Sequence, residues 1–186
     1  GFFQGIVLAR LLLPADFGLV AMVAPAVAFA AMVKELGLNQ ATVQRDQISQ
    51  QIVSNLFWLS VSMSILLAVI MAACAPLLAD FYGEPEVVTI SMWLSLPIIF
   101  ISIGTIPGNL LVRNMDYDKS FVVTLASIII SYPSAIILAY EGFGLYSLVI
   151  QKVLESFIYA LGNFIASNLR LKFFFSRDLL REHLKF

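Results

Sequence analysis

Two ionisable residues, Lys152 and Glu155, lie three positions apart near the middle of the long apolar stretch 142–169. If this stretch crosses a membrane as a helix, Glu155 lies roughly 18 Å from its outer end and roughly 20 Å from its inner end. A charge at that depth costs on the order of 2.5–3.5 kcal/mol, so we expect both side chains to face other helices or water. Two interpretations are open. The residues pair with each other as neighbours on the helix, or they contact a substrate or exchange an ion when the pair opens.

The same stretch carries a polar stripe at steps of four residues: Ser147, Gln151, Glu155, Tyr159, Asn163 and Ser167. Steps of four drift by about 40° each on a helix of 3.6 residues per turn, so only the members from Gln151 to Asn163 share a face. The stripe predicts either the wall of a water-accessible cavity or a buried polar network between helices. We take five residues as candidate lumen residues: Gln151, Lys152, Glu155, Tyr159 and Asn163.

Three arginines are further candidates. Arg10 lies near the outer end of the first apolar stretch, where it either extends to the membrane interface or points inward to bind an anionic group. Arg45 and Arg113 follow the ends of predicted helices on the other side of the membrane. Their positions are typical of orientation signals, and they are also the candidates for the cytoplasmic mouth of a passage.

The composition indicates the class of protein that positions these residues. The chain is 60% apolar and only 12% charged, too few charges for the surface of a soluble domain of 186 residues. Uncharged runs of the length that a membrane-spanning helix needs predict spans at 17–33, 52–77, 87–112 and 120–140. The apolar stretch 143–167 is the fifth complete span, and residues 1–13 are the final part of an earlier helix. The sequence therefore predicts an all-α, polytopic membrane helix bundle of six helices, the first of them truncated.

The basic residues predict how this bundle is oriented. Alternate loops carry all of the Lys and Arg residues outside the spans: Lys34, Arg45, Arg113, Lys119, Arg170, Lys172, Arg177, Arg181 and Lys185. The other turns carry none. Because basic loops stay in the cytoplasm, we expect these loops and the N-terminus to be cytoplasmic. We divide the chain into a transmembrane lobe, 1–169, and a basic amphipathic linker, 170–186.

Two further patterns concern the packing of the spans. Hydroxyl residues recur at alternating steps of four and three in the stretch 120–140: Ser120, Thr124, Ser127, Ser131 and Ser134. Such a seam of small residues is typical of close helix packing. In the stretch 87–112, two prolines and two glycines make it the best candidate for a bent or broken helix: Pro97, Gly104, Pro107 and Gly108.

The sequence predicts no enzyme, no cofactor, no resident metal and no nucleic-acid partner. Its one histidine, His183, lies in the terminal tail, so it cannot serve a triad or metal cluster inside the membrane. A glycine-rich phosphate loop is absent from the sequence. Transport by such a chain would depend on a gradient, on substrate supply or on a partner.

Several segments together resemble one family. They are the residues 9–19 (Ala-Arg-Leu-Leu-Leu-Pro-Ala-Asp-Phe-Gly-Leu), 35–38 (Glu-Leu-Gly-Leu), 43–45 (Val-Gln-Arg), 55–59 (Asn-Leu-Phe-Trp-Leu), 81–86 (Phe-Tyr-Gly-Glu-Pro-Glu), 106–107 (Ile-Pro), 110–115 (Leu-Leu-Val-Arg-Asn-Met) and 142–144 (Gly-Phe-Gly). In order and spacing the chain resembles the bacterial polysaccharide transporters. These are the flippases of lipid-linked oligosaccharides within the multidrug, oligosaccharidyl-lipid and polysaccharide exporter superfamily.

The resemblance implies a two-lobed exporter of which this chain is the N-terminal six-helix lobe. It also implies alternating access in the bacterial inner membrane, moving an undecaprenyl-pyrophosphate-linked oligosaccharide from the inner to the outer leaflet. Its partners would be membrane lipid, the polysaccharide polymerase machinery and a coupling cation, proton or sodium. Arg10 matches the arginine of the family's outer-turn motif, whereas Lys152 and Glu155 match no motif of the family.

Our hypothesis is that the first, second and sixth helices wall a central cavity. There Lys152 and Arg10 would attract the anionic diphosphate, and Glu155 would tune Lys152 or carry the coupling cation. Two alternatives stay open. One is a cation-coupled multidrug exporter of the same superfamily with Glu155 as its cation site, and the other is a non-transporting membrane scaffold of polysaccharide assembly.

Overall fold

The computed structural model describes residues 5, 8, 10–43 and 50–169, and its described part is all-helical. Five long helices follow a short N-terminal segment: α2 (Pro14–Val43), α3 (Gln50–Tyr82), α4 (Glu86–Arg113), α5 (Tyr117–Tyr140) and α6 (Tyr146–Ala166). Each of the five contains a stretch long and apolar enough to cross a membrane. The prediction of an all-α, multi-pass membrane bundle is confirmed. Two predicted features, Arg45 and the linker 170–186, lie outside the described residues.

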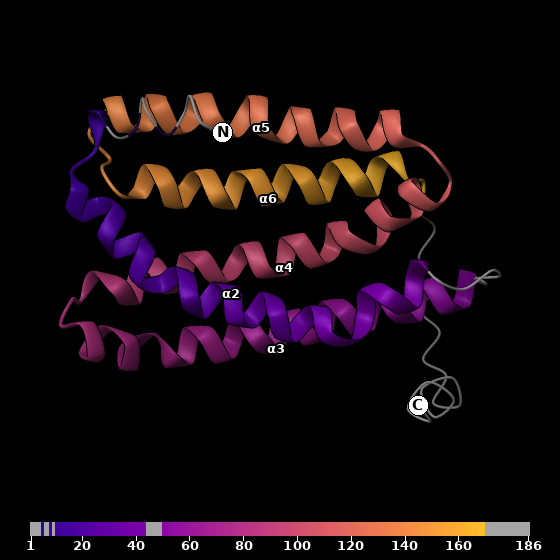
Figure 1. The fold of residues 1–186 in the computed structure, drawn as a ribbon, viewed down its shortest axis with the longest axis horizontal. Helices are drawn as coiled ribbons and strands as arrows, with labels where there is room; N and C mark the ends of the chain where they lie inside the picture. Colours follow the sequence, from indigo (N-terminus) through magenta and orange to yellow (C-terminus); the bar gives the residue numbers. More distant parts are fainter. Residues whose placement is uncertain (1–4, 6–7, 9, 44–49, 170–186) are drawn as a thin grey trace.

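The helices run side by side along the long axis of the molecule (Figure 1). α6 lies between α5 and α4, and α4 in turn packs against α3 and α2. The turn between α3 and α4 and the turn between α5 and α6 lie at one end of the bundle (Figure 1). We call it the acidic end, because the exposed residues Asp80, Glu84 and Glu86 lie there. It is the end that the distribution of basic residues predicts to be outside.

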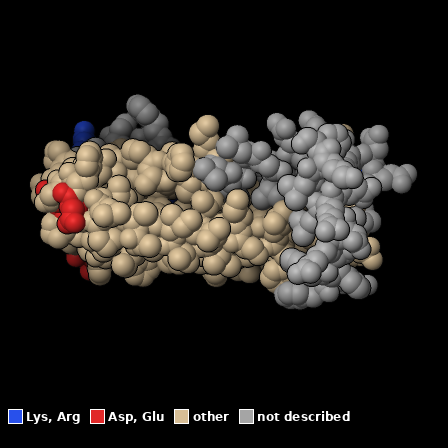
Figure 2. Space-filling view, turned by 90° about the horizontal axis from the view of Figure 1, so that it is seen from below, with Lys and Arg blue, Asp and Glu red and all other residues tan. Residues whose placement is uncertain are grey.

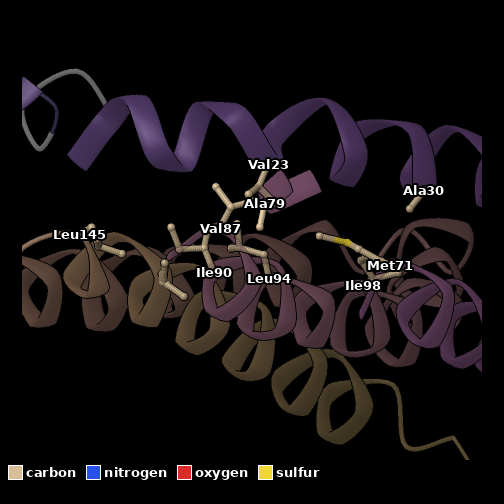
Figure 3. Packing of buried hydrophobic residues seen from close by; sticks show 10 residues of the cluster. Val23, Ala30, Met71, Ala79, Val87, Ile90, Leu94, Ile98 and Leu145 are labelled. Carbon is tan, nitrogen blue, oxygen red and sulfur yellow. The ribbon is translucent and has the colours of Figure 1, made fainter. Parts of the chain in front are cut away.

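Apolar side chains join the helices in three clusters. The largest joins α2, α3, α4 and α6 and includes Val23, Ala30, Met71, Ala79, Val87, Ile90, Leu94, Ile98, Leu145 and Val149 (Figure 3). A second cluster, built on Phe57 and Ile106, joins α3 and α4 near the opposite end. In the third, Leu8 and Leu12 of the N-terminal segment pack with Ala135 and Ala139 of α5. Burial of these side chains stabilises the arrangement that positions α6.

The ends of the helices differ from the predicted spans. α2 continues to Val43 and α3 extends from Gln50 to Tyr82, beyond the predicted spans at 17–33 and 52–77. α6 begins later than predicted, at Tyr146, because Gly142 and Gly144 have φ angles of 86° and 52° that suit a turn and not a right-handed helix. Pro25, Pro97, Pro107 and Pro133 lie inside helices, as the sequence predicts, and so does Pro76 in α3.

Much of the described surface of the bundle is apolar between its two ends. Figure 2 shows the charged side chains of one face gathered at one end, next to a broad band without charge. Large apolar residues are exposed along this band, among them Leu66, Val69, Ile130, Ile137 and Leu161. An exposed apolar surface of this extent is the signature of a protein that contacts lipid. The chain is therefore a multi-pass membrane protein.

Candidate functional site

The two ionisable residues of α6 form an ion pair. Lys152 Nζ donates to Glu155 Oε2 over 3.1 Å, and the side chains of Lys152 and Glu155 are 59% and 25% exposed. The pair is thus closed in this structure, as the first of the two interpretations expects. The exposure of Lys152 leaves most of its ammonium end free to meet water or another group.

The ion pair lies on a polar side of α6. Lys152, Glu155 and Tyr159 point into one arc of the helix, because they are spaced three and four residues apart. Leu161 and Ile165 are exposed on another side of the same helix, which is apolar. The two exposed sides of α6 therefore differ in chemistry, and only the apolar one suits direct contact with lipid.

Toward α4, α6 makes its closest backbone approach. A Cβ atom placed on Gly104 would lie 2.9 Å from the Cα of Ala160 and 2.9 Å from Cδ1 of Tyr159. A Cβ on Gly108 would lie 3.3 Å from the Tyr159 hydroxyl and 3.4 Å from Oδ1 of Asn163. The two glycines, four residues apart, leave room on α4 for the C-terminal half of α6. Such small-residue spacing is a common contact between membrane helices.

Asn163 is held inside this contact. It is 1% exposed, and its Nδ2 donates to the backbone oxygen of Tyr159 over 3.0 Å. Its Oδ1 is buried without a hydrogen-bond partner. Gly108 of α4 lies beside that oxygen, because a Cβ atom built on this glycine would come within 3.4 Å of it. Asn163 therefore lies in the interface with α4, out of reach of a large cargo.

Toward α5, α6 meets a row of small residues. Val123, Ser127, Ser131, Ala135 and Ala139 are buried at steps of four along α5. A Cβ on Gly162 would lie 2.7 Å from Cγ1 of Val123, so the two helices touch closely near one end of the row. Part of the predicted hydroxyl seam, Ser127 and Ser131, thus lies in this interface, whereas Thr124 is exposed.

The structure brings some of the candidate lumen residues together and separates others. Lys152, Glu155 and Tyr159 share the polar side of α6, while Gln151 and Asn163 are buried in its interfaces. Arg10 is exposed, two residues from both Leu8 and Leu12, so it points away from the side of its segment that packs on α5. Arg113 is half-buried in the last turn of α4. That these residues line a passage stays a prediction.

The sequence reasoning did not find the role of the three glycines. The sequence predicts a bend at Gly104 and Gly108, and it gives no prediction for Gly162. The four-residue spacing of Gly104 and Gly108 is the signal that could have found the contact with α6. Among the described residues, no three His, Cys, Asp or Glu side chains come together in a group that could hold a metal ion.

The comparison with known families decides the relationship. The family described as polysaccharide biosynthesis protein matches residues 7–186, nearly the whole chain. The chain belongs to this family. The resemblance drawn from the outer-turn and loop motifs is thereby confirmed.

Three curated proteins are similar to the chain. The succinoglycan biosynthesis transport protein ExoT of Rhizobium meliloti is 31% identical over 91% of this chain and 34% of its own length. The teichuronic acid biosynthesis protein TuaB of Bacillus subtilis is 26% identical over 68% of this chain and 26% of its own length. The lipopolysaccharide biosynthesis protein WzxC of Escherichia coli is 24% identical over 75% of this chain and 28% of its own length.

The chain thus spans about a third or less of the length of these relatives. No solved structure matches it. The names of the relatives place them in the synthesis of surface polysaccharides, and that of ExoT specifies transport.

Proposed function

We propose that this chain forms one lobe of a bacterial inner-membrane transporter of lipid-linked polysaccharide precursors. The cargo would be an undecaprenyl-pyrophosphate-linked oligosaccharide, moved from the inner to the outer leaflet by alternating access. Membership of the polysaccharide biosynthesis family supports this proposal, as does the name of ExoT. The observation that carries it is the exposed ammonium of Lys152 within the apolar helix α6. At that depth a charge needs water, a second lobe or an anionic cargo beside it.

The polar side of α6 has the groups that such a cargo needs. The Lys152 ammonium would bind the diphosphate by charge-assisted hydrogen bonds, and Glu155 would neutralise it while no cargo is bound. Tyr159 continues the same side, where its ring packs against Gly104 and Gly108 of α4. Gln151 and Asn163 would fix the positions of the neighbouring helices. In this proposal the chain acts as a transporter and not as an enzyme, because the cargo would be bound and released unchanged.

The arginines would act at the two ends of the path. If the N-terminus is cytoplasmic, Arg45 and Arg113 would belong to the inner mouth, where they would attract the anionic head group from the inner leaflet. Arg10 would contact the cargo near the outer side, from a segment that faces away from α5. A proton or sodium gradient would drive the cycle, and the released precursor would pass to the polysaccharide polymerase machinery.

The direct test is transport by the full-length protein in proteoliposomes, with a radiolabelled oligosaccharide on undecaprenyl pyrophosphate. Lys152→Ala should lower the transport rate about tenfold or more, since a hydrogen bond to a charged group is lost. Lys119→Ala is the matched control, because Lys119 and Asp116 form an exposed pair of the same spacing at 3.2 Å. Full activity of a Lys152→Ala, Glu155→Gln double variant would remove the pair from the mechanism.

A second test asks whether the polar side of α6 is wet. In a cysteine-free full-length background, Lys152→Cys should react with a membrane-impermeant thiol reagent. Leu161→Cys, on the exposed apolar side, and Asn163→Cys, buried against α4, should both react slowly. Equal, slow reaction at all three positions, with surface polysaccharide still produced, would favour a scaffold. Substrate-dependent ion flux with small organic cations, and none with the lipid-linked sugar, would favour a multidrug exporter.

A further inference from the structure

Ser131 differs from its neighbours on α5. Thr124, Ser127 and Ser134 each donate a hydrogen bond to a carbonyl of their own helix, over 3.0, 2.8 and 2.7 Å. Ser131 is fully buried, yet its hydroxyl has no hydrogen-bond partner. A buried hydroxyl that could turn to its own helix and does not is an unfilled donor. In a bilayer such a group carries a desolvation penalty, so a state of the protein in which the hydroxyl finds a partner is favoured by that amount.

The register of α5 and α6 places Ser131 opposite Glu155. The two antiparallel helices meet near one end at Val123 and Gly162, and Leu148 packs near the other end on the cluster that contains Ala139. Ser131 is eight residues from both Val123 and Ala139, halfway along the row on α5. Glu155 is seven residues from both Gly162 and Leu148, halfway between the two contacts on α6.

The same spacing gives the direction of Glu155. Seven residues are close to two turns of a helix with 3.6 residues per turn. Glu155 therefore points in nearly the same direction as Gly162, which meets Val123 of α5. Leu148, which packs on the cluster shared by the N-terminal segment and α5, points the same way. Its carboxylate, however, is occupied in this structure by the ammonium of Lys152 at 3.1 Å.

We propose that Ser131 is the second partner of Glu155, used when Lys152 binds an anionic cargo. This inference rests on the proposed function and adds a positioning residue to the same site. In the resting state Glu155 accepts a hydrogen bond from Lys152, and the Ser131 hydroxyl has no partner. When the diphosphate takes the ammonium, the carboxylate turns by one rotamer toward α5 and accepts a hydrogen bond from Ser131. Once separated from Lys152, the Glu155 carboxylate is thus stabilised by Ser131. It then no longer competes with the diphosphate for the Lys152 ammonium.

A transport measurement tests this role in the full-length protein. With the radiolabelled oligosaccharide on undecaprenyl pyrophosphate as the probe, Ser131→Ala should raise the apparent KM about tenfold or more, because the displaced carboxylate loses a charge-assisted hydrogen bond. Ser127→Ala is the control. Ser127 is buried one turn away on the same row, but its hydroxyl donates a hydrogen bond to the backbone carbonyl of Thr124. An unchanged KM in the Ser131→Ala variant of an active transporter would overturn the inference.

A stability measurement tests it without any cargo. Lys152→Ala frees Glu155, so the carboxylate should then bind Ser131. Ser131→Ala alone should leave the Tm unchanged or slightly raised, whereas in the Lys152→Ala background it should lower the Tm by about 2–4 °C. Ser127→Ala should shift the Tm equally in both backgrounds. Additive shifts for Ser131→Ala and Lys152→Ala would overturn the inference, whatever the cargo. If the wild-type protein does not move the probe while the Tm shifts are non-additive, the proposed function fails and the contact stands.

Discussion

The two interfaces of α6 are built in opposite ways. Toward α4 the glycines lie on the partner helix, and a Cβ at Gly104 would come 2.9 Å from a backbone atom of Ala160. Toward α5 the glycine lies on α6 itself, and a Cβ at Gly162 would come 2.7 Å from a side-chain methyl of Val123. In the contact with α4 the backbone of Gly104 lies against the backbone of Ala160. In the contact with α5 the Val123 side chain lies against the backbone of Gly162.

This difference indicates which neighbour of α6 can relieve a close contact by moving a side chain. Two helical backbones in contact move only as whole helices, so the contact with α4 is rigid. Val123 on α5 can change its rotamer, although its β-branch restricts χ1. A substitution by alanine would also remove its contact with Gly162. The polar residues that we propose to change partners, Glu155 and Ser131, lie at the adjustable interface. The buried amide of Asn163 lies at the rigid one.

The largest effect is expected for Gly104→Ala. A helical Gly→Ala change gains about 1 kcal/mol of helix propensity. Here the new methyl meets the backbone of Ala160, and overpacking that the neighbour cannot relieve costs about 3 kcal/mol. We therefore expect a net loss of about 2 kcal/mol in the free energy of unfolding, measured by SDS titration of the purified full-length protein. A variant as stable as the wild type would show that this interface is not rigid.

A smaller loss is expected for Gly162→Ala, about 1 kcal/mol, because the methyl meets a side chain instead of a backbone. The same titration of the double variant Gly162→Ala, Val123→Ala should recover this loss, since the shorter side chain removes the contact at 2.7 Å. Val123→Ala alone provides the control for the lost packing. If the second substitution fails to restore stability, the clash lies elsewhere.

The smallest effect is expected for Gly108→Ala, within about 0.5 kcal/mol of the wild type. The nearest atoms would be the Tyr159 hydroxyl at 3.3 Å and the side chain of Asn163. Both are side-chain ends that can shift by a few tenths of an ångström, so the gain in helix propensity of about 1 kcal/mol roughly offsets the crowding. A loss as large as that of Gly104→Ala would place Gly108 in the rigid contact as well.

The sequence predicted the class of fold because long uncharged runs admit few other structures. It misplaced the helix ends for a physical reason. The loss of charge marks where a helix enters hydrocarbon, whereas backbone hydrogen bonds continue into the interface, as they do in α2 to Val43. α6, in contrast, begins later than the apolar stretch does, because Gly142 and Gly144 hold apolar residues such as Phe143 in a turn.

The candidate site was predictable only in part. A spacing of three residues is enough to predict that Lys152 and Glu155 can pair. That Gln151 and Asn163 are buried while Lys152 is exposed depends on where α4 and α5 lie, which no local pattern contains. Ser131 belongs to a recognisable seam, but its unfilled hydroxyl is a property of the packed helices.

The ion pair of α6 also bears on how the protein is made. α6 has the lowest mean hydropathy of the five candidate spans, and its two charges oppose its entry into lipid as a lone segment. It follows α5 along the chain and packs between α5 and α4. The earlier helices would therefore already lie beside the translocation channel when α6 is synthesised. Packing against their small-residue surfaces would favour the release of α6 into the membrane. Biogenesis of this bundle would then be an ordered assembly, in which a segment too polar to insert alone depends on companions synthesised before it.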